Sequence, residues 1–270
     1  MYNHQPLRKL KIINDLIITL IQTDLEWENI DANLSLFDKK IDLAPDDTHL
    51  IVLPEMFTTG FSMKSHSLFE DMSGHTISWL KEKSRQKNVD IAGSAIIKER
   101  QNYYNRLLWV KPGGDVFSYD KCHLFPLAGE DKVFTPGKNN ITIELNGWRI
   151  RPFICYDLRF PGWIRNRDYV YDIALFVANW PEKRSLHWKT LLLARAIENH
   201  CYIIGVNRIG SDEMGSTYSG DSSIISPKGD ILFQKAFDIC VHTSKLSYQT
   251  LKEYRKSFPM GTGILKNHGI

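Results

Sequence analysis

The sequence of 270 residues predicts a single α/β domain, and three observations carry this prediction. Short runs of β-branched and apolar residues alternate with segments whose apolar residues recur at helical spacing. Near the N-terminus, two such runs enclose a helical segment, an order that requires parallel strand pairing. No repeat, low-complexity tract or linker divides the chain, so the elements are expected to share one core.

The first elements predict a βαβ unit. DLIITLIQTDL is typical of a central strand, because β-branched and apolar residues run together over a short span. In WENIDANLSLFDKKIDLA, the residues Ile30, Leu34, Phe37 and Ile41 recur at helical spacing and predict an amphipathic helix. The apolar run HLIVLP then supplies the second strand.

The middle of the chain predicts a helix and two hairpins. A helical segment over about residues 76–86 leads into the strand VDIAGSAII. NRLLWV and VFSYDK flank the turn KPGGD, where glycine supplies the positive φ that tight turns need. ITIEL and WRIRPFI flank Asn146-Gly147, a strong hairpin signal between two apolar runs.

The C-terminal part returns to the α/β pattern. DIALFVAN predicts a buried strand, and a helix over about residues 185–199 can turn Leu192, Leu193 and Ala196 toward a sheet. CYIIGVNR predicts another strand, and GDSSIISPKGDILFQK predicts a hairpin. The polar segment from Ser247 is helical at first.

Composition narrows the classes of function. Apolar residues make up 43% and charged residues 24%, and the net charge of +3 forms no basic clusters, which argues against nucleic-acid or membrane partners. The four cysteines show neither a CxxC pair nor zinc-site spacing, so we expect no metal and a reducing, cytoplasmic location. Neither a signal peptide nor an apolar run long enough to span a membrane is expected.

Three titratable residues stand where apolar runs end: Glu55 in IVLPEMF, Lys121 in SYDKCHLF and Cys155 in FICYDLRF. Together they could form a nucleophile with its helpers. A free thiol is mostly protonated at neutral pH, so a reactive cysteine needs a base or a cation nearby. Glu55 could take the proton, and Lys121 could stabilise a thiolate or an oxyanion. The backbone N–H of Tyr156 could be a second oxyanion donor.

Each of these residues also has an ordinary structural interpretation. Cys155 alone would more often fill a core, Glu55 would be a loop carboxylate, and Lys121 a solvated charge at a hairpin end. Spacing along the chain does not show that the three residues converge. Ligand sites of open α/β sheets do gather beyond the carboxyl ends of the strands, which favours convergence.

The motifs LPEMF, YDKCHLF and CYDLRFP, together with ANWP, HWKTLLLARAIEN and YSGDSSIISPKGD, make the chain resemble the nitrilase superfamily of carbon-nitrogen hydrolases, in its Nit and omega-amidase branch. The resemblance covers nearly the whole chain. It implies a four-layer αββα sandwich with mixed sheets over residues 15–270, preceded by an extension at 1–14. It also implies a catalytic Glu55, Lys121 and Cys155, a second glutamate at Glu130, and no metal or organic cofactor. Cys122 departs from the pattern, because relatives commonly carry a basic residue there.

The same resemblance suggests hydrolysis of small dicarboxylate monoamides, such as 2-oxoglutaramate or 2-oxosuccinamate, through a thioester on Cys155. Arg159 is a candidate for the remote carboxylate of the substrate, since a guanidinium binds carboxylate bidentately. It could instead hold Asp157 or a loop carbonyl. Trp180 and Phe57 are candidates to line the pocket, although aromatic residues at strand ends often only pack.

Other functions stay open from the sequence alone. Nitrile hydrolysis would use the same three residues, a silent member of the family could act as a binding protein, and a reactive thiol of low pKa could serve as a redox sensor. The resemblance further implies a homodimer or a larger assembly of identical chains. The only other partner expected is the small amide substrate.

Overall fold

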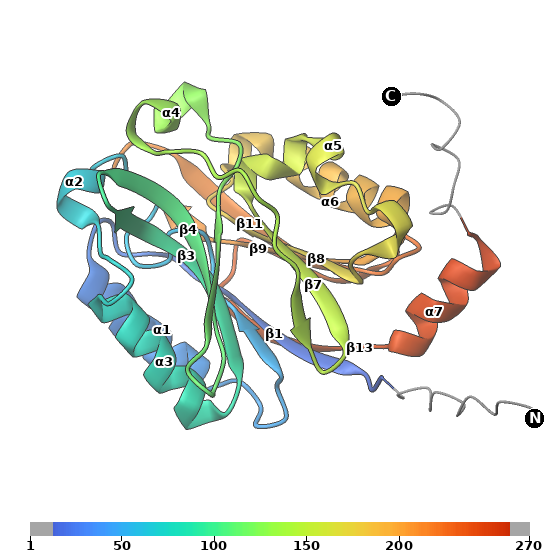
Figure 1. Cartoon of the computed structure of the whole chain (residues 1–270). Coiled ribbons are helices and arrows are strands. Elements are labelled where there is room, and N and C mark those ends of the chain that lie inside the picture. The colour runs from blue at the N-terminus through green and yellow to red at the C-terminus, as the bar shows by residue number, and fades with distance from the viewer. Residues whose placement is uncertain (1–12, 260–270) are drawn as a thin grey trace, which may run out of the picture.

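Two β-sheets stacked face to face form the centre of the molecule, and helices cover their outer faces (Figure 1). The computed structural model describes residues 13–259. Helices α1 (Ile30–Ile41) and α3 (His75–Lys87) lie outside one sheet, and α5 (Pro161–Ile164) and α6 (Ser185–Asn199) lie outside the other (Figure 1). The four-layer αββα sandwich implied by the resemblance is therefore confirmed.

The first sheet has six strands in the order β13-β1-β2-β3-β4-β5. The pairs β1–β2 and β2–β3 are parallel, with α1 and α3 as the crossover helices, which confirms the predicted βαβ unit. The remaining pairs are antiparallel. The strands of this sheet are β1 (Leu16–Gln22), β2 (Leu50–Val52), β3 (Asp90–Glu99), β4 (Asn102–Val110), β5 (Val116–Asp120) and β13 (Cys240–Leu246).

The second sheet has seven strands, in the order β10-β11-β9-β8-β7-β6 with β12 beside β11. Its central strands β7, β8 and β9 are parallel and its other pairs are antiparallel, so both sheets are mixed, as expected. The strands are β6 (Ile143–Leu145), β7 (Trp148–Ile154), β8 (Ile173–Ala178), β9 (Tyr202–Asn207), β10 (Ile209–Ser211), β11 (Thr217–Ile225) and β12 (Ile231–Ala236).

The helices follow the amphipathic segments of the sequence. Asn29 caps α1 through its side chain, and Ser247 caps α7 in the same way. The predicted helix over 185–199 matches α6 at both ends. The helices are α1 (Ile30–Ile41), α2 (Ser65–Leu68), α3 (His75–Lys87), α4 (Glu130–Val133), α5 (Pro161–Ile164), α6 (Ser185–Asn199) and α7 (Tyr248–Ser257). Short 3₁₀ helices include η1 (Pro126–Ala128), η2 (Cys155–Arg159), η3 (Arg167–Tyr169) and η4 (Glu182–Arg184).

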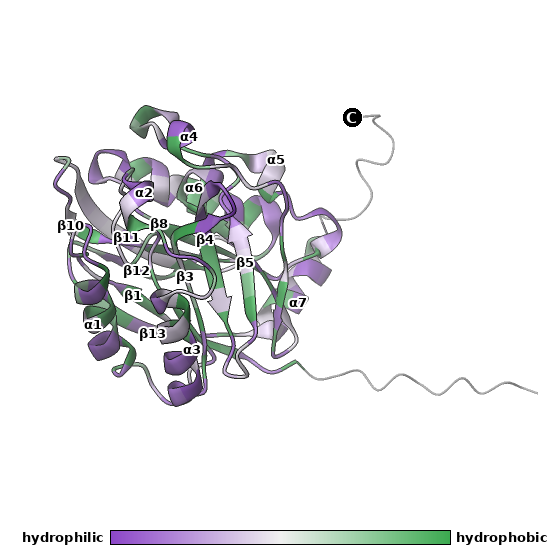
Figure 2. Cartoon of the chain, turned by 60° about the vertical axis from the view of Figure 1, so that its left-hand side comes forward, coloured by the Kyte–Doolittle hydropathy of each residue, from purple (hydrophilic) through white to green (hydrophobic). Residues whose placement is uncertain are grey.

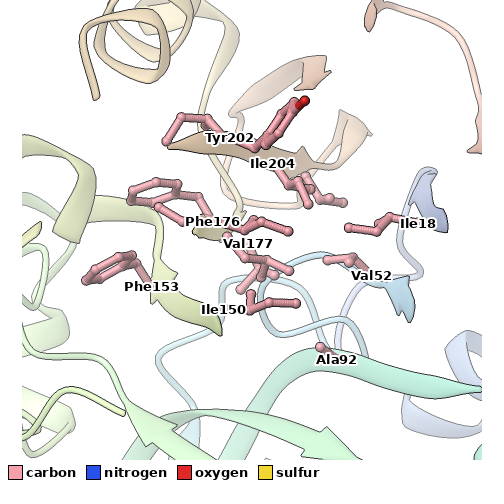
Figure 3. Packing of buried hydrophobic residues seen from close by; sticks show 14 of the residues in the cluster. Ile18, Val52, Ala92, Ile150, Phe153, Phe176, Val177, Tyr202 and Ile204 are labelled. Atoms are coloured by element: carbon pink, nitrogen blue, oxygen red, sulfur yellow. The ribbon is translucent and has the colours of Figure 1, made fainter. Parts of the chain in front are cut away.

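The main apolar core lies between the two sheets. Figure 3 shows Ile18 and Val52 of the first sheet next to Ile150, Val177 and Ile204 of the second, and all five are fully buried. Strand β8 is buried at every position, which explains why its sequence is a continuous apolar run instead of an alternating one.

A second cluster lies between the first sheet and its two helices. Phe37 of α1 and Leu80 of α3 pack there against Ile51 and Ile91 of the strands. The opposite sides of both helices carry hydrophilic residues, as Figure 2 shows. Their amphipathic spacing thus reflects one face on the sheet and one face in solvent.

Turn geometry agrees with the hairpin predictions. Asn146 and Gly147 both have positive φ, at 52° and 88°, as a type I′ turn between β6 and β7 requires. Strand β13 was not predicted, because its sequence CVHTSKL alternates weakly and carries several polar residues. It lies at the edge of the first sheet, paired antiparallel to β1.

Most of the predicted N-terminal extension, residues 1–14, lies outside the described residues. At its end, the carbonyl of Asn14 accepts a hydrogen bond from Trp148 Nε1 at 2.9 Å. Within residues 13–259, none of the helices has the length and apolar character needed to cross a membrane.

Candidate active site

Three strand ends from both sheets deliver the polar residues of the site. Glu55 follows β2, and Lys121 directly follows β5, both in the first sheet. Cys155 directly follows β7 in the second sheet. All three side chains are buried. Lys121 contacts Glu55 and lines one cavity with Cys155, so the structure brings together three residues that lie far apart in the sequence.

The Lys121 ammonium lies between two buried carboxylates. Its Nζ donates to Glu55 Oε1 at 2.9 Å and to the two oxygens of Glu130 at 3.0 and 2.9 Å. Both carboxylates and the ammonium are inaccessible to solvent. The predicted second glutamate is thus in direct contact with the lysine, and its carboxylate also accepts the backbone N–H of Phe125 at 2.6 Å.

This arrangement shifts the pKa values of the buried groups. Burial alone would lower the pKa of Lys121, but the attraction of Glu130 and Glu55 outweighs it and the pKa is raised, so the ammonium keeps its charge. Burial raises the pKa of Glu130, and the attraction of Lys121 opposes this while the charge of Glu55 adds to it. Two carboxylates facing one cation leave the cluster with an excess of negative charge when both are ionised.

Glu55 is fixed in one orientation by two asparagines that sequence analysis did not identify. Asn105 Nδ2 donates to Glu55 Oε1 at 2.8 Å and also reaches Glu130 Oε1 at 3.2 Å. The backbone N–H of Asn179 donates to Glu55 Oε2 at 2.7 Å, and its side-chain amide donates to the Glu55 carbonyl at 2.5 Å. Ser94 in turn donates to Asn105 Oδ1 at 2.9 Å. The sequence offered one signal for these two residues: each asparagine stands at the edge of an apolar run, Asn105 in NRLLWV and Asn179 in DIALFVAN.

Cys155 is held at a sharp corner between β7 and η2. Its φ of 43° lies in the left-handed region, which a non-glycine residue rarely adopts. The buried carboxylate of Asp157 fixes this corner, because it accepts hydrogen bonds from Ile154 N at 3.0 Å, His123 N at 2.9 Å and Tyr119 OH at 2.7 Å. The N–H of Tyr156 follows at the start of η2.

The environment of Cys155 keeps its thiol protonated. Burial raises its pKa well above the usual value, the negative charge of Glu55 raises it further, and Lys121 opposes the shift. The thiol donates its hydrogen bond to the carbonyl oxygen of Asn179, at 4.0 Å. A redox sensor would need the opposite shift toward a low pKa, whereas a thiol beside a carboxylate can react by giving up its proton to that base.

An open cavity of about 580 Å³ reaches the thiol. Cys155, Lys121 and Tyr156 line it, and so do Arg159 and Trp180. Within residues 13–259, no group of three His, Cys, Asp or Glu side chains is placed to hold a metal ion. The cavity therefore reaches the Cys155 thiol and the Lys121 side chain.

Phe57 does not line the cavity, so this prediction was wrong. Its ring points into the apolar cluster under the helices, 5.4 Å from the ring of Phe37 and 6.0 Å from that of Trp79. The backbone turns at Met56, which has a φ of 41°, so Glu55 and Phe57 point to different sides of the sheet end. The Phe57 ring packs closely against Gly93. A larger residue at position 93 would clash with this ring.

Arg159 stands at the cavity wall over an aromatic ring. Its guanidinium carbon lies 4.7 Å from the ring centroid of Trp180, and its Nη2 lies 3.0 Å from His187 Nδ1. Asp157, the alternative partner considered from the sequence, is occupied by the corner contacts described above. Trp180 both lines the cavity and packs against Trp188, at 5.4 Å between ring centroids.

Comparison with known proteins places this geometry in context. The family model described as carbon-nitrogen hydrolase matches residues 17–256. Omega-amidase YafV of Escherichia coli is 46% identical over 245 residues, which cover 90% of this chain and 94% of that protein. The 2-oxoglutaramate amidase of Bacillus subtilis is 32% identical over 93% of this chain and 98% of its own length. The crystal structure of a CN-hydrolase superfamily protein from Xanthomonas campestris, with an arsenic adduct in its active site, superimposes with a TM-score of 0.89 at 38% identity, covering 91% of this chain and 95% of that one.

Proposed function

The chain belongs to the nitrilase superfamily of carbon-nitrogen hydrolases, in its omega-amidase and Nit branch, and we propose that it hydrolyses small carboxylate-bearing amides through a thioester on Cys155. The observation that carries the proposal is the buried Lys121 ammonium between Glu55 and Glu130 beside a thiol that opens into a cavity. This set holds a nucleophile, a base and an oxyanion partner.

In the first step, Glu55 is the general base. The Cys155 thiol gives its proton to the Glu55 carboxylate as its sulfur attacks the amide carbon. The raised pKa of the thiol supports this order, because little thiolate exists before the substrate arrives. Asn105 and Asn179 support the role by holding the carboxylate in place.

The attack turns the carbonyl oxygen into an oxyanion that needs donors. Lys121 and Tyr156 both line the cavity beside Cys155, and the Lys121 ammonium and the Tyr156 backbone N–H are the proposed donors. Glu130 holds the ammonium through both of its oxygens and so positions it for this contact. The role of Glu130 is thus to position Lys121 and keep it charged.

The acyl group then passes to water. The tetrahedral intermediate collapses as Glu55 returns its proton to the nitrogen, so the C–N bond breaks and ammonia leaves. The thioester on Cys155 remains. Water attacks it while Glu55 takes a proton, and the C–S bond breaks with that proton returning to sulfur. The products are a carboxylic acid and ammonia, which exchange a proton to become carboxylate and ammonium, and the enzyme regains its starting state.

The proposed substrates carry a carboxylate remote from the amide, as in 2-oxoglutaramate and 2-oxosuccinamate. The names of the two relatives above support this class. Arg159 is the proposed anchor, because its guanidinium lies on the cavity wall and a planar fork can bind a carboxylate bidentately.

Ammonia release from a panel of amides and nitriles tests the proposal. We expect 2-oxo acid amides to react fastest, simple amides such as butyramide slowly, and nitriles at the background rate. Cys155→Ala should abolish turnover, and Arg159→Lys should raise KM for 2-oxoglutaramate with little change for butyramide. A nitrile as the best substrate would contradict amide hydrolysis. An unchanged KM for 2-oxoglutaramate in Arg159→Lys would contradict the role of Arg159 as the carboxylate anchor.

A further inference from the structure

A second guanidinium, that of Arg184, lines the same cavity as Arg159. It belongs to η4, which follows Trp180 after β8. Its guanidinium carbon lies 5.2 Å from the ring centroid of Phe125, and its backbone carbonyl accepts a hydrogen bond from Trp180 Nε1 at 2.8 Å. Neither the mechanism nor the proposed anchor uses this residue.

Aromatic rings connect the two arginines along one wall. The Phe125 ring under Arg184 lies 5.0 Å from the ring of Tyr156, edge to face. Arg159 lies 6.0 Å from that Tyr156 ring and 4.7 Å from the ring of Trp180. The two cations are therefore presented on a continuous apolar wall that also contains the residue following the nucleophile.

No carboxylate neutralises this pair of cations in the part of the chain that the structure describes. The acids of the cavity are engaged elsewhere. Glu28 pairs with Lys64 at 2.7 Å, and Asp212 accepts a hydrogen bond from Tyr218 OH at 2.6 Å. Because neither guanidinium has a carboxylate partner there, a ligand that brings negative charge and acceptor oxygens is favoured at this wall.

We propose that Arg184, acting with Arg159, makes the enzyme select 2-oxo acid amides over the corresponding amino acid amides, an inference that rests on the proposed function. In 2-oxoglutaramate, a carbonyl oxygen stands next to the remote carboxylate, and both groups accept hydrogen bonds. In glutamine, an ammonium group takes the place of that carbonyl. Arginine has five donors and no acceptor, so the cation pair can donate to the carbonyl of the first compound and repels the ammonium of the second.

Three substrates of equal chain length separate these effects. 2-Oxoglutaramate carries the carboxylate and the carbonyl, glutaramate carries the carboxylate with a plain methylene, and glutamine carries the carboxylate and the ammonium. Arg184→Met removes the charge and keeps most of the side-chain length, whereas Arg184→Lys keeps the charge. Steady-state kcat/KM is measured for each variant with each substrate.

For Arg184→Met, we expect kcat/KM for 2-oxoglutaramate to fall about 10-fold or more, as for the loss of a charge-assisted hydrogen bond. The value for glutaramate should change less than about threefold, and that for glutamine should rise. The preference for 2-oxoglutaramate over glutamine should thus shrink by more than an order of magnitude. Arg184→Lys should retain most of the preference.

A purely structural role gives a different result. Arg184 packs on Phe125, whose N–H binds Glu130, so misplacement of that loop would slow all three substrates by the same factor. An unchanged preference in Arg184→Met would therefore overturn the inference, whatever the absolute rates. Arg85→Met, on the exposed side of α3, is the matched control for loss of an arginine and should leave all three values unchanged. If the wild-type protein turns over none of the three substrates but another amide, the proposed function fails.

Discussion

At the scale of single residues, the site depends on charged side chains that are buried. Glu55, Lys121 and Glu130 are ion-paired in the interior, where the removal of one partner leaves an uncompensated charge at a cost of about 3–5 kcal/mol. Burying this cluster of three charged side chains costs desolvation free energy, so the cluster contributes little net stability. Its value is chemical, because it holds a base and a cation in fixed positions beside the thiol.

Glu55→Gln separates the two effects of this carboxylate on Cys155. The change removes the base, so kcat should fall by about 10²- to 10⁴-fold. It also removes a negative charge that raises the pKa of the thiol while Lys121, which lowers it, remains. The pKa of Cys155 should therefore fall, and alkylation of this cysteine by iodoacetamide should reach half of its maximal rate at a lower pH.

Mass spectrometry of the peptide that contains Cys155 distinguishes its alkylation from that of the other three cysteines. Glu144→Gln, at an exposed position of β6, is the control and should leave both the activity and the alkylation profile unchanged. An alkylation profile of Glu55→Gln that moves to higher pH would contradict the electrostatic account of the site.

At the scale of elements, close packing of α6 on the second sheet supports the corner at Cys155. Arg195 of α6 donates to the carbonyl of Leu158 in η2 through Nε at 3.1 Å and Nη2 at 2.8 Å. On its sheet side, α6 approaches β9 at Gly205, where a β-carbon would lie 2.6 Å from Leu192 Cδ1 and 2.9 Å from Trp188 Cζ2. Glycine is therefore needed there for the helix to lie at this depth.

Gly205→Ala should lower the free energy of unfolding by about 1–3 kcal/mol, because it overpacks the contact between α6 and β9. Gly162→Ala, in the short helix α5, meets no heavy atom within 4 Å and should be neutral or slightly stabilising. Denaturant unfolding of both variants measures the difference. Equal stability of the two variants would show that α6 can shift away from the sheet at no cost.

Elements with a strong local pattern could be predicted from the sequence, and those defined by distant partners could not. The periodicity of α6 and the Asn146-Gly147 turn are local properties, and both match the structure. Strand β13 forms by pairing with β1, a contact distant in the sequence that the local pattern of residues does not indicate. The strand-end residues Glu55, Lys121 and Cys155 were identified by their unusual positions. Asn105 was not, because its importance comes only from the two carboxylates that the fold brings to it.

At the scale of the whole molecule, the sandwich explains why the site lies where it does. The two sheets share an apolar core, and the polar residues of the site follow the ends of β2, β5 and β7. The four-layer fold could be inferred from the sequence mainly because several motifs resemble those of the nitrilase superfamily. Alternating strands and helices alone are compatible with several α/β architectures.

We further propose that two copies of the chain pair in solution, as the resemblance implies. Leu186 and Ile197 of α6 are 71% and 46% exposed on the outer side of the second sheet, where a partner could cover them. Sedimentation at micromolar concentration should give twice the mass of the chain, and the double variant Leu186→Lys, Ile197→Lys should give a monomer. A wild-type protein that sediments only as a monomer would end this proposal.

The most direct test of the account is the covalent state of Cys155 during turnover. The protein is mixed with 2-oxoglutaramate, quenched with acid within milliseconds and measured by intact-mass and peptide mass spectrometry. We predict an adduct with the mass of the substrate less ammonia on the peptide that contains Cys155, and neither adduct nor ammonia release in Cys155→Ala. Ammonia release by Cys155→Ala at the wild-type rate, or an acyl group on a different cysteine, would contradict the account.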